Sequence, residues 1–171
     1  KEGLSLINGT SQILSWLTIS HAILSDLLPL ADLILSTSIE ALSGSIAPSD
    51  ERLHAARPHP GQALVANRIL RALQNSEINK AHADCDKVQD PYSFRCAPQV
   101  HGPANEVLQR LGDVITIELN SATDNPLVFP DPNNPGPHEV VSGGNFHGEI
   151  LALTADAMNA AVHEIASISE R

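Results

Sequence analysis

The sequence predicts an all-α protein, a bundle of long helices with irregular loops and one short β-hairpin. Three long segments repeat apolar residues every three or four positions, which is the spacing of an α-helix. Between them lie stretches rich in Pro and Gly, which are typical of turns. The chain has 171 residues, of which 42% are hydrophobic, enough to form the core of one domain.

The first long segment has apolar residues on more than one face between Ile13 and Leu28, which is typical of a buried helix. Thr10 or Ser11 is expected to cap its start. Pro29 either kinks this helix or begins a second one that runs to Gly44 as its C-cap.

Residues 45–61 are expected to form a connector in which Arg52 and His54 are solvated. A shorter helix follows over residues 62–73, and the polar residues 75–87 are expected to form a loop. The side chains of His82, Asp84, Cys85 and Asp86 lie too close together in the sequence to match the spacing of a folded metal site, so no metal is predicted.

The second long segment, residues 99–120, carries one apolar stripe with charged residues between its members. A short hairpin is predicted from residues 127–129 and 139–141, which flank a run of Pro, Asn and Gly. Gly143 and Gly144 are then expected to open the last helix.

The net charge of −10, with no basic run, argues against binding to nucleic acid or to an anionic membrane surface. Polar residues between Ser15 and Asp26 interrupt the apolar run near the start, which argues against a transmembrane span. The two cysteines, Cys85 and Cys96, match no zinc spacing. They are interpreted as reduced thiols of a cytoplasmic protein.

The segment from Gln89 to Arg95 combines side chains suited to binding an acid. Gln89, Tyr92 and Arg95 are spaced three residues apart, so one helical turn would bring them near one face, and Asp90-Pro91 fits a helix start. An amide, a phenol and a guanidinium can bind a carboxylate and move a proton beside it. On spacing alone, a solvated or interface patch explains these three residues better than a catalytic site does.

Four stretches of the chain together resemble one known family. Residues 89–102 read Gln-Asp-Pro-Tyr-Ser-Phe-Arg-Cys-Ala-Pro-Gln-Val-His-Gly, which looks like the signature of the histidine ammonia-lyases. These enzymes are members of a family of lyases and aminomutases that use a methylidene-imidazolone electrophile. The other stretches similar to family motifs occur in the same order along the chain: residues 1–10, 119–129 and 142–149.

The resemblance implies roles for five residues. Asn8 would bind the oxygen of the electrophile or the substrate, and Arg95 would clamp the substrate carboxylate. Tyr92 would polarise or protonate near the electrophile, Gln89 would hydrogen-bond the carboxylate or order the loop, and Phe146 would pack against the electrophile. Without the resemblance, Asn8 fits a turn, Arg95 an inter-helix salt bridge and Phe146 core packing. His147 and Glu149 are interpreted as structural.

The implied activity is the elimination of ammonia from L-histidine to give urocanate, a step of histidine catabolism. The family forms its electrophile from Ala-Ser-Gly, a tripeptide that does not occur in these 171 residues and is expected before Lys1. The chain is therefore interpreted as the central part of a longer enzyme, incomplete at both ends and inactive alone. The resemblance also implies a homotetramer whose pockets take residues from several subunits.

Pro91, Cys96 and His147 favour histidine as the substrate, because lyases for phenylalanine and tyrosine more often carry other residues in these motifs. Three alternatives stay open. The first two are a phenylalanine or tyrosine ammonia-lyase and an aminomutase of the same family. The third is a helical assembly module with no catalytic activity.

Overall fold

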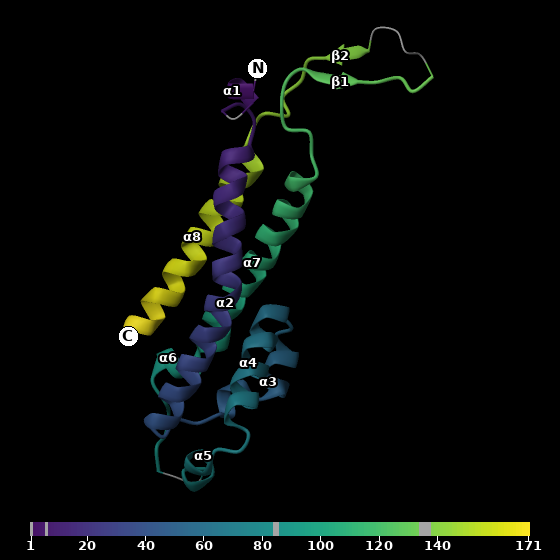
Figure 1. Cartoon of the computed structure of the whole chain (residues 1–171). Helices are drawn as coiled ribbons and strands as arrows, with labels where there is room; N and C mark the ends of the chain where they lie inside the picture. Colours follow the sequence, from purple (N-terminus) through teal and green to yellow (C-terminus); the bar gives the residue numbers. More distant parts are fainter. Residues whose placement is uncertain (1, 6, 84–85, 134–137) are drawn as a thin grey trace.

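Long helices lying side by side form the body of the molecule (Figure 1). The structure is a computed structural model that describes residues 2–5, 7–83, 86–133 and 138–171. The three longest helices are α2 (Ser11–Ala41), α7 (Ala97–Leu119) and α8 (Glu149–Glu170). The prediction of an all-α bundle is confirmed. The shorter elements are α1 (Glu2–Ser5), η1 (Ala47–Ser49), α3 (Glu51–Ala56), α4 (Pro60–Leu73), α5 (Glu77–Ala81) and α6 (Tyr92–Arg95).

Two hydrophobic clusters hold the bundle together. The larger one joins α2, α7 and α8, and its buried members are Leu14, Leu28, Ala104, Leu108, Leu111, Val114, Ile115, Leu151 and Met158. The smaller one lies where α2 ends and packs against α4 and α6, with Ile39, Val65, Ile69, Leu73 and Phe94 as its buried members. Burial of these side chains provides the main driving force for folding.

Helix α2 continues through Pro29 as one helix of 31 residues, so the alternative in which Pro29 begins a second helix is wrong. The buried positions Leu28, Asp32, Ser36 and Ile39 follow one another at spacings of three or four across and beyond the proline. The packing of this continuous face offsets the one backbone hydrogen bond that proline cannot donate.

Helix α2 ends at Ala41 with Leu42 as its C-cap, two residues before the C-cap that the sequence predicted at Gly44. Ser43, with a φ of 51°, takes the left-handed conformation expected for Gly44. Ser43 N donates to Glu40 O at 3.1 Å, and Gly44 N donates to Ile39 O at 2.7 Å. These two bonds form a Schellman motif, which satisfies carbonyls that the end of the helix would otherwise leave without a partner.

By length and composition, α2 is the one helix among the described residues that is long and apolar enough to cross a membrane. Core helices of soluble proteins pass the same test. In this chain α2 packs on α4, α7 and α8 through one face, and only 22% of its most apolar stretch is buried, so the expectation of a helix buried on more than one face is wrong. Its opposite side carries many exposed apolar residues, among them Trp16, Ile19, Ile23, Leu30 and Leu33.

The connector after α2 is more ordered than predicted, because it contains η1 and α3. The prediction that His54 is solvated is wrong: this residue is only 3% exposed. Its ring accepts a hydrogen bond at Nδ1 from Gln62 Nε2 (2.9 Å) and donates from Nε2 to Pro48 O (3.1 Å). These bonds hold η1 against α4 and explain why a polar ring is buried.

The exposed Arg52 is paired with a carboxylate. Its guanidinium donates to Asp50, with Nη2 2.6 Å from Oδ2. The hydrogen bonds from the side chain and backbone of Arg52 lower the pKa of Asp50 to about 2. Asp50 also caps α3 through a bond from Arg52 N. The charged pair therefore marks the start of α3.

Other helices also differ from the prediction: α7 begins two residues before the predicted range 99–120 and ends one residue before its end. Helix α4 starts at Pro60, two residues earlier than expected, with the proline at its first position. A short helix, α5, occupies part of the predicted loop 75–87. Its N-cap is Ser76, whose side chain accepts a hydrogen bond from Asn79 N at 3.0 Å.

The hairpin is confirmed, with β1 (Leu127–Phe129) antiparallel to β2 (Glu139–Val141). Helix α8 begins at Glu149, so Gly143 and Gly144 do not open it as predicted. The preceding residues are held as a loop instead, because Asn125 Oδ1 accepts hydrogen bonds from Ser142 Oγ (3.0 Å) and Gly143 N (2.7 Å).

Candidate functional site

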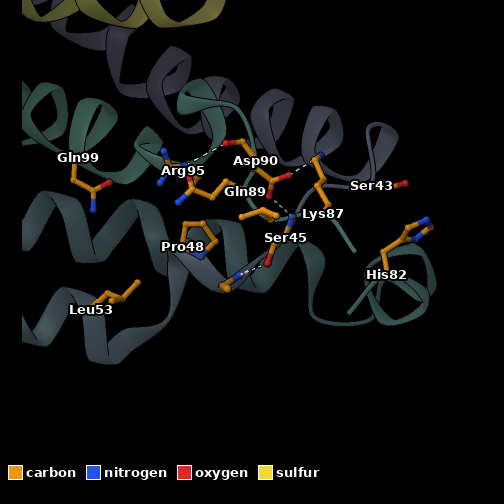
Figure 2. Close-up of a pocket in the computed structure, with 12 residues that line it drawn as sticks. Ser43, Ser45, Pro48, Leu53, His82, Lys87, Gln89, Asp90, Arg95 and Gln99 are labelled. Atoms are coloured by element: carbon orange, nitrogen blue, oxygen red, sulfur yellow. Dashed lines mark hydrogen bonds and ion pairs between the residues drawn. The ribbon is translucent and has the colours of Figure 1, made fainter. Parts of the chain in front are cut away.

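Gln89 and Arg95 line the same cavity (Figure 2). The cavity has a volume of about 420 Å³. Its walls come from the turn after α2, from η1 and α3, from the end of α5, from α6 and the segment before it, and from the first turn of α7. The lining residues include Ser43, Ser45, Pro48, Leu53, His82, Lys87, Asp90 and Gln99. The amides of Gln89 and Gln99 and the guanidinium of Arg95 thus face one cavity. These groups suit the binding of an anion.

Asp90 anchors this segment to the end of α2. Its Oδ2 accepts a hydrogen bond from Ser45 N at 2.6 Å, and Lys87 Nζ lies 2.7 Å from its Oδ1 (Figure 2). The side chain of Asp90 is almost completely buried, so these charge-assisted contacts are only weakly screened. They fix the backbone from which both Gln89 and Arg95 project.

Arg95 makes its contact with the backbone. Its Nε donates to Asp90 O at 3.2 Å. Within the described part of the chain, Arg95 makes no salt bridge with a carboxylate, so the inter-helix salt bridge considered as an alternative is not formed there. The described residues hold this side chain by Nε alone, which leaves its two terminal nitrogens for another acceptor.

Tyr92 does not join Gln89 and Arg95 in this cavity. Helix α6 begins only at Tyr92, so Gln89 lies outside the helical turn that was expected to align the three residues. Tyr92 is 71% exposed and does not line the cavity. A hydrogen bond with the Cys96 side chain raises the pKa of Tyr92. The phenol therefore keeps its proton at neutral pH and can donate it.

Asn8 lies at the far end of α2, in an exposed turn between α1 and α2. Gly9, with a φ of 75°, contacts the backbone of Thr123 so closely that a Cβ atom at Gly9 would overlap the Thr123 carbonyl. The buried Thr10 donates from Oγ1 to Glu118 Oε1 at 2.7 Å. The segment that carries Asn8 is therefore fixed to the end of α7.

Phe146 lies in the loop before α8 and is half exposed. Asn145 Nδ2 donates to Ala122 O at 3.3 Å, and the loop ends at Gly148, against the methyl group of Thr10. Three of the four sequence motifs, those around Asn8, Asn125 and Phe146, thus meet at one end of the bundle.

The predicted site residues therefore fall into two groups at opposite ends of α2 (Figure 1). Asn8 and Phe146 lie near α1 and the hairpin, while Gln89, Tyr92 and Arg95 lie near the end of α2. A helix of 31 residues is about 45 Å long at the usual rise per residue. A single copy of this chain cannot place both groups around one small molecule.

A buried network of charged side chains lies near the end of the bundle that carries Arg95. This network was not predicted from the sequence. Asp32 is 1% exposed and lies between His101 (Oδ1 to Nδ1, 2.7 Å) and Arg68 (Oδ2 to Nη1, 2.9 Å). Arg68 also donates to Asn105 Oδ1 at 3.0 Å. The available signal was the position of Asp32 on the same helical face as Leu28 and Ile39, because a buried carboxylate requires a partner.

Among the residues that the structure describes, no group of three His, Cys, Asp or Glu side chains could hold a metal ion. Of the cluster considered in the sequence, His82 lies on a wall of the Gln89–Arg95 cavity and Nδ1 lies 3.0 Å from Ile78 O. Asp84 and Cys85 lie outside the described residues.

Comparison with known proteins shows which family this arrangement represents. The family model described as aromatic amino acid lyase matches residues 1–171. The chain belongs to this family. Histidine ammonia-lyase from Sorangium cellulosum is 47% identical over 171 residues, which are 100% of this chain and 33% of that protein. The chain thus spans about a third of the length of the curated relatives it matches.

Solved structures of family members share the fold. The crystal structure of histidine ammonia-lyase from Trypanosoma cruzi has a TM-score of 0.82 and 45% identity, covering 99% of this chain and 30% of that one. A phenylalanine aminomutase from Pantoea agglomerans has a TM-score of 0.83 and 31% identity, covering 97% of this chain and 34% of that one. Lyases and aminomutases therefore contain the same helical arrangement.

Proposed function

We propose that the protein to which this chain belongs eliminates ammonia from L-histidine and releases urocanate. The observation that carries this proposal is the shared cavity of Gln89 and Arg95, whose terminal guanidinium nitrogens are available for a carboxylate. The identity of 43% to 47% with several histidine ammonia-lyases supports histidine over other amino acids.

Each predicted residue has a role that fits its position. Arg95 binds the substrate carboxylate with two parallel hydrogen bonds, and Gln89 adds an amide donor on the same wall. Tyr92 stays protonated and polarises or protonates a group near the electrophile. Asn8 donates to an oxygen that gains negative charge.

The family's methylidene-imidazolone is the cofactor we expect, and we expect no metal. When bound, this group supplies an electrophile that makes the amino group of the substrate a better leaving group. The residues present fit it, because the exposed amide of Asn8 can donate to its oxygen and the half-exposed ring of Phe146 can pack on its flat ring. Both residues lie at the same end of the bundle.

The separation of the two groups supports assembly from several copies. Because one chain holds Asn8 and Arg95 at opposite ends of α2, a complete site requires the Arg95 end of one copy beside the Asn8 end of another. The exposed apolar side of α2 offers the surface for such contacts. We propose a homotetramer, located in the cytoplasm.

The decisive experiment uses the full-length protein with L-histidine, L-phenylalanine and L-tyrosine as separate substrates. Histidine should yield ammonia and urocanate, which is followed by its near-ultraviolet absorbance. An aminomutase would give a β-amino acid without release of ammonia. Release of ammonia from phenylalanine or tyrosine but not from histidine would identify the protein as a phenylalanine or tyrosine ammonia-lyase. Lack of activity on every one of the three amino acids would favour a non-catalytic assembly module.

The 171 residues alone should release no ammonia, because Ala-Ser-Gly does not occur among them. The purified chain mixed with histidine should show no increase in absorbance over a blank. Turnover by the chain alone would show that the electrophile is not needed or arises elsewhere.

Light scattering on the full-length protein measures its molecular mass in solution and so tests the proposed tetramer directly.

A further inference from the structure

The side-chain oxygen of Gln99 is buried and has no hydrogen-bond partner among the described residues. Such atoms are uncommon in folded proteins, and each calls for an explanation from its surroundings. Gln99 lies in the first turn of α7 and its side chain lines the same cavity as Gln89 and Arg95. The oxygen without a donor therefore belongs to the wall of the candidate substrate site.

Arg95 offers the donors that this oxygen lacks. Gln99 follows Arg95 by four residues, and Figure 2 shows the amide oxygen of Gln99 on the side that faces Arg95. A guanidinium has five N–H groups. One of them, on Nε, is used by Asp90 O. A carboxylate bound end-on uses two more, one on each terminal nitrogen, so two N–H groups remain.

We propose that Gln99 is a positioning residue for Arg95 in the reaction proposed above, on which this inference rests. Gln99 Oε1 accepts one of the remaining N–H groups when the substrate carboxylate is bound. Asp90 O and Gln99 Oε1 then hold the guanidinium at two points. This orients the guanidinium plane so that its two terminal nitrogens face the substrate carboxylate. Gln99 acts through Arg95 and does not touch the reacting atoms.

Two variants of the full-length enzyme separate this role from simple packing. Gln99→Leu keeps a similar volume but removes the acceptor, whereas Gln99→Glu keeps an acceptor in the same place. The loss of one hydrogen bond to a charged group predicts that Gln99→Leu lowers kcat/KM on histidine by about ten- to a hundredfold. The loss should come chiefly from KM, and Gln99→Glu should retain most of the activity.

A double-mutant cycle with Arg95→Lys tests whether Gln99 acts through Arg95. Residues that act through one another show non-additive effects. In the Arg95→Lys background, Gln99→Leu should therefore change kcat/KM by less than about twofold. A full additive loss in that background would overturn the proposal, as would equal losses for Gln99→Leu and Gln99→Glu.

Binding of two fragments of the substrate identifies the group that Gln99 serves. Imidazolepropionate carries the carboxylate without the amine, and histamine carries the amine without the carboxylate. Gln99→Leu should weaken calorimetric binding of imidazolepropionate and leave that of histamine unchanged. The reverse pattern would show that Gln99 binds the substrate ammonium and would overturn the proposal. An inactive wild type would instead count against the proposed function itself.

Discussion

His101 Nδ1 lies 2.7 Å from Asp32 Oδ1 in the interior of the bundle, and both side chains are almost completely buried. Arg68 binds the other oxygen of the same carboxylate from α4. One aspartate thus links α2, α4 and α7. The link lies close to the candidate site, because His101 follows Gln99 by two residues on α7.

Asp32→Ala should destabilise the chain by roughly 3 kcal/mol, the lower end of the cost of removing one partner from a buried ion pair. The lower end applies because Arg68 is partly exposed, with 30% of its side chain accessible, and water can replace part of the lost contact. Chemical unfolding measures the change. Asp26→Ala, an exposed position on the same helix, is the matched control and should change stability little.

Gly102→Ala should destabilise the crossing of α4 and α7. A Cβ atom at Gly102 would lie 2.5 Å from Gln62 N and 2.6 Å from Gln62 Cα, so the backbones would have to separate. Overpacking of this kind costs about 1–3 kcal/mol or more. Glu106 Oε1 on α7 accepts a hydrogen bond from Gly61 N on α4 at 2.9 Å, and separation of the two helices would also disturb this bond.

Gly143→Ala is the control for this crossing, because a Cβ atom at Gly143 would meet nothing within 4 Å. Thermal midpoints of the two variants should therefore differ, with only Gly102→Ala lowered. Equal midpoints would show that α4 and α7 can separate at no cost, contrary to the close approach of their backbones.

Cys96→Ala should lower the pKa of Tyr92. The hydrogen bond with Cys96 raises this pKa, so removing the thiol removes the largest cause of the shift. Tyr92 is the only tyrosine in the chain, and absorbance near 295 nm reports its ionisation. The contribution of this bond to stability is present below the pKa of the unfolded chain and is lost as pH rises through the pKa of the folded one.

An unchanged titration of Tyr92 in Cys96→Ala would show that the phenol and the thiol do not interact. In the active enzyme the same variant should shift the alkaline side of the pH–rate profile toward lower pH, if Tyr92 must be protonated to act.

Periodicity was sufficient to predict the long helices, because their packing faces repeat along the sequence. The run of Pro, Asn and Gly between its strands predicted the hairpin. Local signals failed at Pro29, where the continuous buried face of α2 overrides a tendency to break the helix. They also failed at His54, whose partners Pro48 and Gln62 become neighbours only when η1 packs on α4. Contacts of this kind depend on the fold and leave no local pattern.

The candidate site was predictable in part. Gln89 and Arg95 are close in sequence and line one cavity, because Asp90 fixes the short segment between them. The distance between Asn8 and Arg95 was not predictable from motifs, since it depends on α2 continuing without a break. Gln99 was missed because its only signal is an unpaired buried oxygen, which a sequence cannot show.

The guanidinium of Arg95 gives the sharpest test of the proposed function, through Arg95→Ala and Arg95→Lys in the full-length enzyme. Removing one partner of a buried, hydrogen-bonded charge pair costs roughly 2–5 kcal/mol. This corresponds to a loss of about thirtyfold to a few thousandfold in kcat/KM on histidine. Arg95→Lys should recover only part of the loss, because an ammonium keeps the charge without the two parallel donors.

The thermal midpoints of the same variants separate binding from folding. Among the residues that the structure describes, Arg95 makes one hydrogen bond to its own chain, from Nε to Asp90 O, so its replacement should lower the midpoint only slightly. Normal kinetics with a much lower midpoint would assign Arg95 to the fold and remove it from the site. Histamine, which lacks the carboxylate, should bind the wild type and Arg95→Ala almost equally. If histamine distinguishes them, Arg95 shapes the cavity without binding the carboxylate.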